Sequence, residues 1–207
     1  MQRDCQSGIT TSTGEYRDTL KAPWYSGLAQ GQGISVLVRA HTESGDARCL
    51  HAAGTAFESF QRPIEEGGIA LTDESGDLWF EQYIISPPTH ILNGFIWVLW
   101  GVYDYALATK ESAAQELFAR GVRTLLHHLD RYDLGFWSLY EQSGTRPPMV
   151  ASAFYHRLHI VQSRVMHRLT GEELFARVAD CWQDYTCGRV NRARALAYKA
   201  LFKLCYY

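Results

Sequence analysis

The sequence predicts a mainly α fold, an α/α toroid built as an incomplete α/α barrel of inner and outer helix pairs with short β-hairpin insertions. One expected helix, at residues 89–103, is apolar almost all round, which is typical of a helix packed on every side by other helices. Helices of this buried kind alternate along the chain with amphipathic ones. The buried helices are expected to begin near Trp24, Pro88 and Met149, 64 and 61 residues apart, so the unit repeats three times.

The individual elements follow from local patterns of apolar and breaking residues. The inner helices are expected at residues 24–40, 89–103 and 151–169, and amphipathic partners begin near Asp46, Ser112 and Thr170. Pro63 ends the first partner, and a last helix covers residues 189–204. Alternating apolar residues at 69–71 and 78–83 predict a β-hairpin, and residues 134–140 form a second extended run. In a toroid, the loops that carry Tyr83 and Tyr140 emerge at one rim.

Length and composition limit the classes of function. A chain of 207 residues buries enough surface to fold without metal or disulfide staples, so we expect no cofactor. The net charge of −2 provides no global field for a polyanion, which argues against a nucleic acid partner. The five cysteines are odd in number and lack metal-ligand spacing, so we interpret them as small buried hydrophobes or inert thiols.

Residues 1–23 are expected to form a flexible N-terminal arm or stub, and residues 24–207 a single helical domain. The first eight residues lack the apolar core of a signal peptide, so a cytoplasmic location is the default expectation. The apolar helix is shorter than the roughly 20 apolar residues that a membrane span needs, so no membrane span is expected. The sequence allows a homodimer.

Polar residues of the third inner helix form a stripe. Ser152, Tyr155, His159 and Gln162 lie within about 40° of one another on a helical spiral. One interpretation is a satisfied hydrogen-bond network in the core. The other is a sugar site, because small polar groups and aromatic faces that meet in a cavity suit a carbohydrate. No phosphate loop, paired-cysteine metal motif or Gly-x-Ser-x-Gly elbow is present in the sequence.

Three motifs resemble the C-terminal domain of D-glucuronyl C5-epimerases. They read WYSGLAQGQ at residues 24–32, LNGF at 92–95 after Tyr83, and YHRLHIVQ at 155–162. Their order and spacing resemble those of the family over residues 24–189. The resemblance implies an α/α barrel with a cleft that acts, without a cofactor, on glucuronate units of an acidic polysaccharide of the heparosan or heparan type, forming iduronate.

The resemblance also implies site residues. Three catalytic tyrosines of the family fall on Tyr83, Tyr140 and Tyr155. Epimerisation removes the C5 proton and returns one from the opposite face, so it needs an acid/base group on each side. A cation near a phenol would favour its basic form. Candidates for this cation are Arg39, Arg146 and Arg157. The substrate-binding candidates are Gln30, Glu81, Gln82, Asn93, Arg146, His156, His159 and Gln162.

The sequence departs from the family pattern at three places. Gln82 stands where the family has a proton-transferring glutamate, and glutamine cannot transfer a proton in that way. Glu81 is adjacent and is expected to share a strand face with Tyr83. Ser143 stands where an arginine is expected to bind the substrate carboxylate, with Arg146 the nearest replacement. The family also has a β-rich domain before the helical one, where this chain has only about twenty residues.

Three hypotheses of function follow. The first is a uronate C5-epimerase or its catalytic helical half. The second is a glucuronan lyase, which shares the proton abstraction but then expels the 4-linked sugar. The third is a non-catalytic glycan-binding or vestigial domain, which Gln82 favours.

Overall fold

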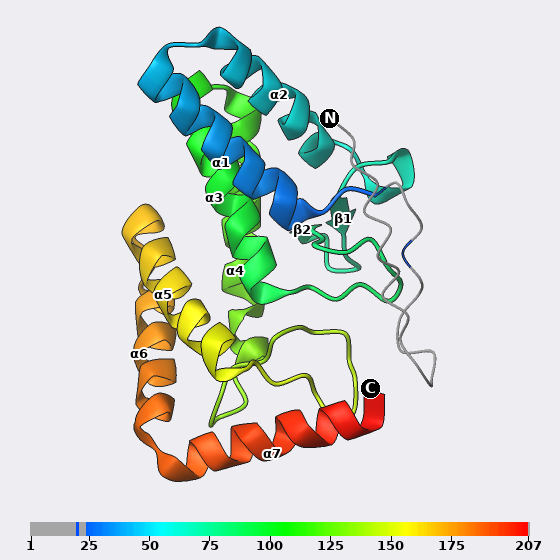
Figure 1. Ribbon diagram of the computed structural model, residues 1–207, viewed down its shortest axis with the longest axis vertical. Coiled ribbons are helices and arrows are strands. Elements are labelled where there is room, and N and C mark those ends of the chain that lie inside the picture. The colour runs from blue at the N-terminus through cyan, green and yellow to red at the C-terminus, as the bar shows by residue number, and fades with distance from the viewer. Residues whose placement is uncertain (1–19, 21–23, 207) are drawn as a thin grey trace. The chain divides into compact units, whose positions relative to one another are not determined.

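The computed structural model describes Leu20 and residues 24–206 of the 207-residue chain (Figure 1). These residues divide into two compact units. The first takes in Leu20, residues 24–90 and residues 94–127, and the second takes in residues 91–93 and 128–206. Apart from Leu20, the predicted arm at residues 1–23 lies outside the described residues.

Two helices of the first unit pack side by side, α1 (Gly27–Ser44) and α2 (Ala47–Gln61) (Figure 1). The Ser26 hydroxyl caps α1, and the Asp46 carboxylate accepts the Arg48 N–H to cap α2. Helix α2 ends at Gln61, as expected from the proline at position 63. These capping side chains fix both helix starts close to where the sequence predicts them.

The β-hairpin of the first unit is present and shorter than expected. It consists of β1 (Ala70–Thr72) and β2 (Leu78–Phe80), antiparallel, after a 3-10 turn, η1 (Ile64–Glu66). The strand stops at Phe80 because the backbone then turns, and the Glu81 carboxylate accepts the backbone N–H groups of Thr89 and His90. The expectation that Glu81 and Tyr83 share a strand face is therefore wrong.

The apolar helix is α3 (Leu92–Thr109), and its amphipathic partner is α4 (Ser112–His128). Helix α3 is buried along most of its length, as predicted. Its Gly101 meets α1 so closely that a Cβ there would lie 2.7 Å from the Cα of Gly31. Only glycines at this crossing let the two backbones approach. Partner α4 packs through Phe118, whose ring centroid is 5.0 Å from that of Tyr103.

The second unit contains η2 (Leu129–Tyr132), α5 (Ala153–Thr170), α6 (Glu173–Cys187) and α7 (Arg189–Tyr206). Helices α5 and α6 lie side by side (Figure 1). The starts of α1, α3 and α5 are 65 and 61 residues apart, which confirms the predicted repeat. Residues 134–140, predicted as an extended run, form isolated β-bridges, Ser138 with Asp133 and Leu139 with Val150, and no continuous strand.

The core of the second unit is an aromatic and aliphatic cluster. Its buried members are Phe136, Trp137, Val150, Ala151 and Ala195. The half-buried tyrosines at positions 140, 155, 185 and 198 pack against it. Burial of these rings holds the loop after η2, the start of α5 and the middle of α7 in one place. Among the described residues, no helix combines the length and the hydropathy that crossing a membrane requires.

Candidate functional site

Two of the three tyrosines that the sequence singles out lie in contact. The ring centroids of Tyr140 and Tyr155 are 4.8 Å apart, with the ring planes inclined at 61°. Tyr155 stands in the first turn of α5, where its N–H donates to the capping hydroxyl of Ser152 at 3.3 Å. Tyr140 is held by its N–H, which donates to the Met149 carbonyl at 2.8 Å. The first turn of α5 and the loop that precedes this helix therefore bring the two phenol rings together.

A hydroxyl–imidazole cluster supports the same region from inside. The Ser138 hydroxyl lies 2.8 Å from Nδ1 of His156 and 3.0 Å from Nδ1 of His159. All three residues are completely buried. The His156 Nε2–H donates to the Trp182 carbonyl at 3.0 Å, since a carbonyl can only accept, so its Nδ1 accepts the Ser138 N–H. Both nitrogens of His156 are thus taken by protein groups, which favours a positioning role.

Burial keeps these imidazoles neutral. It lowers the pKa of His156 to about 4, against weaker raising contributions from its bond to the Trp182 carbonyl and from Asp133. It lowers the pKa of His159 to about 3, with a further lowering by His156. At neutral pH neither histidine is a cation or a proton donor of the imidazolium kind. The two phenols are therefore better placed than the histidines to transfer protons in this unit.

Several polar atoms around the cluster are buried and have no hydrogen-bond partner among the described residues. His159 is one, through its Nε2 atom. Gln162 donates from Nε2 to the Asn93 carbonyl at 3.0 Å, but its Oε1 and the Oδ1 of Asn93 have no such partner. Buried polar groups are nearly always satisfied by protein, water or ligand. These three side chains therefore have hydrogen-bonding capacity to offer a ligand.

A lysine of α7 approaches the tyrosine pair. Lys199 Nζ lies 5.9 Å from the Tyr140 ring centroid, on its face, and donates to the Val150 carbonyl at 3.2 Å. Burial lowers the pKa of Lys199, as does Lys203, while Glu141 raises it. Sequence reasoning missed Lys199 because it is one of several cations on α7, and periodicity does not say which of them meets an aromatic face.

The third tyrosine belongs to the first unit. Tyr83 is half-buried, with its ring centroid 5.8 Å from that of Trp24. The two residues come from the first two family-like motifs, which therefore meet in space. That Tyr83 faces the same sugar as Tyr140 and Tyr155 stays a prediction.

The neighbours of Tyr83 differ in how they are held. The buried Glu81 carboxylate has Oε1 2.6 Å from Nδ1 of His90, and its Oε2 accepts from Thr89. Gln82 is also buried and packs against Gly94 of α3, where an added Cβ would come within 3.3 Å of Gln82 Cβ. The Gln82 Oε1 atom has no hydrogen-bond partner among the described residues. Gln30 is half-buried on α1.

The cations proposed from sequence lie in different settings. Arg39 pairs with Asp104 at 3.5 Å in the first unit. Arg146 is exposed, and its backbone N–H and carbonyl both bond to the Tyr206 hydroxyl. Arg157 is exposed on α5 and lines a cavity of the second unit together with Arg192 and Lys199 of α7. The Ser143 hydroxyl donates to the Glu141 carboxylate at 2.7 Å. It is therefore already engaged and, being neutral, cannot pair with a substrate carboxylate as the expected arginine would.

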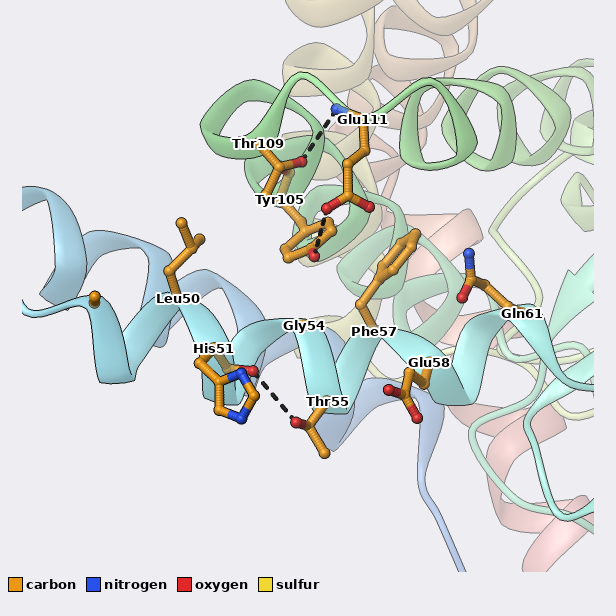
Figure 2. Close-up of a pocket in the computed structure, with 11 residues that line it drawn as sticks. Leu50, His51, Gly54, Thr55, Phe57, Glu58, Gln61, Tyr105, Thr109 and Glu111 are labelled. Atoms are coloured by element: carbon orange, nitrogen blue, oxygen red, sulfur yellow. Dashed lines mark hydrogen bonds between the residues drawn. The ribbon is translucent and has the colours of Figure 1, made fainter.

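A cavity of about 480 Å³ lies apart from the predicted residues, within the first unit. Figure 2 shows it between α2 and the end of α3, with the Tyr105 hydroxyl donating to Glu111 at 3.0 Å. Burial and the Glu111 carboxylate raise the pKa of Tyr105 to about 12. This phenol is harder to ionise than an ordinary tyrosine, and its ring stacks on Phe57 with centroids 4.5 Å apart. No predicted site residue lines this cavity.

Comparison with known proteins decides the family. The family model of the D-glucuronyl C5-epimerase C-terminus matches residues 6–184. The chain belongs to this family. A D-glucuronyl C5-epimerase of Caenorhabditis elegans is 32% identical over 197 residues, an alignment that covers 87% of this chain and 32% of the relative. An uncharacterised protein of Methanocaldococcus jannaschii is 29% identical over 168 residues, covering 80% of this chain and 53% of that protein. The chain thus spans about a third and about half of these relatives.

Solved structures agree on the fold. Cellobiose 2-epimerase from Spirochaeta thermophila matches with a TM-score of 0.54 and 16% identity, covering 76% of this chain and 41% of that one. A family 76 α-mannanase of Bacteroides thetaiotaomicron matches with a TM-score of 0.53 and 12% identity, covering 77% and 42%. These likenesses confirm the predicted fold class, a mainly α chain of the α/α toroid kind. At 16% and 12% identity, these structural matches show the fold and do not indicate a substrate for this chain.

Proposed function

We propose that this chain is the helical catalytic part of a uronate C5-epimerase, which converts D-glucuronate to L-iduronate units in a polysaccharide of the heparosan type. The observation that carries the proposal is the contact between Tyr140 and Tyr155, with ring centroids 4.8 Å apart, both within the residues that the family model matches. The buried amide oxygens of Asn93 and Gln162 have no hydrogen-bond partner among the described residues, which leaves them free to bond a water molecule or a ligand group that reaches them.

The proposed reaction needs a base on one face of the sugar ring and an acid on the other. A phenolate takes the C5 proton, and the electrons of the C5–H bond move into the carboxylate to form an enolate. A phenol on the opposite face then gives a proton back to C5. Within the second unit, Tyr140 and Tyr155 are the candidates for the acid–base roles and for donating a hydrogen bond to the enolate oxygen, and a role for Tyr83 stays a prediction. Neutral His156 and His159 fit positioning roles, because burial keeps the pKa of both well below neutrality.

The experiment is proton exchange in deuterated water with N-acetylheparosan. An epimerase places deuterium at C5 of the uronate without cleaving the chain. Unsaturated uronate ends would instead identify a lyase, and binding without exchange would identify a glycan-binding domain. Each result overturns the other two.

A second candidate, a vestigial glycan-binding domain, is favoured by Gln82, which is buried beside Gly94. Glutamine cannot carry the proton that the family's glutamate carries. If the chain is vestigial, the natural protein shows no exchange, and Gln82→Glu introduces it. If tyrosines are sufficient, the natural protein exchanges and Gln82→Glu changes the rate without creating the activity.

A further inference from the structure

We propose that Arg157, Arg192 and Lys199 form a binding site for the carboxylate of a hexuronate unit, beside the Tyr140–Tyr155 pair. The three cations line one cavity of about 210 Å³ in the second unit. The proposal rests on the proposed function for the identity of the sugar, and on the cavity itself for the charge of the ligand.

The charge of the lining is one-sided. Arg157 comes from α5, and Arg192 and Lys199 come from α7, while none of the lining residues carries a carboxylate. Among the described residues neither arginine makes an ion pair. Three cations around one cavity repel one another, so the arrangement is stabilised by an anion that enters it. Lys199 is partly buried, and burial, with a smaller contribution from Lys203, lowers its pKa, while Glu141 raises it.

The rest of the lining suits a sugar. Ser152 and Thr186 add hydroxyls, and its apolar part consists of Trp137, Ala151, Ala153, Ala195 and Leu196. The cavity volume equals about seven water molecules in the liquid, which suits one small polar ring rather than an extended chain. A charged carboxylate with hydroxyls around an apolar ring face matches these walls.

Lys199 connects the cavity to the tyrosines. It lines the cavity, and its Nζ lies 5.9 Å from the Tyr140 ring centroid. A carboxylate held by Lys199 therefore lies near the phenol pair. The site also offers a replacement for the arginine that the family motif leads one to expect at Ser143.

Helix α7, which supplies two of the three cations, lies beyond the residues that the family model matches. The family model ends its match at residue 184, and α7 begins at Arg189. Two of the three cations thus come from a helix outside the matched residues. The family match could not have identified them.

The test is titration of the whole chain with methyl β-D-glucuronide, followed by calorimetry or by backbone NMR shifts. Arg192→Gln and Lys199→Met should each weaken binding about tenfold, since each removes a bond to a charged group. Lys199→Arg should restore most of the affinity. Arg189→Gln is the matched control, because Arg189 is exposed on the same helix and does not line the cavity, and it should bind as the natural chain does.

Two further probes, a neutral sugar and a free anion, test whether binding needs the charge and the sugar ring together. Methyl β-D-glucoside should bind at least tenfold more weakly than the glucuronide, and sodium phosphate should not displace the glucuronide at equal concentration. Equal binding of glucoside and glucuronide, equal binding by the variants and the natural chain, or displacement by phosphate would overturn the proposal. If charge-dependent binding is found but no deuterium enters C5, the epimerase proposal fails and the site stands. If exchange is found and the variants bind normally, only the site fails.

Discussion

Two regions of this molecule, each in a different compact unit, show what a cavity alone does and does not indicate. The α2–α3 cavity of the first unit has about 480 Å³, and its one tyrosine–carboxylate pair is satisfied, Tyr105 donating to Glu111 (Figure 2). The Tyr140–Tyr155 region of the second unit borders a smaller cavity of about 210 Å³, through the shared Lys199. That smaller region has buried, unsatisfied polar atoms around it.

The difference teaches that volume is a poor guide to chemistry here. In the larger cavity burial and the Glu111 carboxylate raise the pKa of Tyr105, and its hydroxyl already donates to that carboxylate, so it is not free to act as a base. In the second unit the histidine pKa values are lowered by burial, and atoms such as His159 Nε2 retain bonding capacity. Perturbed groups with unmet hydrogen bonds point to function better than a large opening does.

The largest expected effect comes from removing one hydroxyl in each region. Tyr155→Phe should lower C5 exchange by about 10³-fold, because acid–base groups contribute roughly 10²–10⁴-fold. Tyr105→Phe removes the same atom from the larger cavity and should leave exchange unchanged. Exchange rates in deuterated water measure both, and circular dichroism checks the fold. Full exchange by Tyr155→Phe would remove this tyrosine from the mechanism.

The next largest effect is expected in the pH dependence of the free energy of unfolding. Because the folded pKa values of His156 and His159 lie near 4 and 3, below the usual 6.5, the unfolded chain binds more protons than the folded one below pH 6.5. The contribution of the two histidines to the free energy of unfolding should therefore be complete above pH 6.5. It should decrease as the pH falls below 6.5, by at most about 1.4 kcal/mol per pH unit for each histidine. Urea unfolding at a series of pH values measures this slope.

Variants assign that slope to its source. His159→Gln cannot titrate and should reduce the slope between pH 6.5 and 4 to about half. His51→Gln, an exposed residue of the larger cavity, should leave the slope unchanged. A slope that His51→Gln alters as much as His159→Gln would show that the buried cluster is not the source.

A smaller effect is expected from the shared hydroxyl of the cluster. Ser138→Ala leaves the Nδ1 atoms of both histidines without that partner, so the free energy of unfolding should fall by about 1–3 kcal/mol. Glu111→Gln in the larger cavity keeps an acceptor for Tyr105 and should change it by less than about 0.5 kcal/mol. Thermal and urea unfolding measure both. Comparable losses from the two variants would contradict the contrast between the regions.

The smallest effect should come from narrowing the larger cavity. Gly54→Ala replaces a glycine inside α2, and helix propensity predicts a gain in stability of up to about 1 kcal/mol. The new Cβ would lie 3.2 Å from the Tyr105 hydroxyl, which must shift slightly. Exchange at C5 should not change. A marked loss of exchange would indicate that the larger cavity contributes to function after all.

The sequence predicted helices better than strands, for a physical reason. Apolar periodicity over 15 to 17 residues identifies α2 or α4, whereas a strand depends on partners far away in the chain. Residues 134–140 have a strand-like composition, but no neighbouring strand pairs with them along their length. The run after Phe80 ends because the buried Glu81 carboxylate binds Thr89 and His90, which no local pattern reveals.

The candidate site was predictable where a motif carried it. Tyr140 and Tyr155 were named from the family resemblance, and their contact follows once α5 and the loop before it are placed. Ser138 and Lys199 were not named. Ser138 lies in a segment with no periodic signal, and its role depends on two histidines of α5. Lys199 lies on α7, beyond the residues that the family model matches.

The most direct test of this account is deuterium incorporation at C5 of N-acetylheparosan by the natural chain, Tyr155→Phe and Tyr105→Phe, measured side by side. The account predicts deuterium at C5 without chain cleavage for the natural chain and for Tyr105→Phe, and almost none for Tyr155→Phe. No deuterium with the natural chain, or equal incorporation by the two variants, would contradict it.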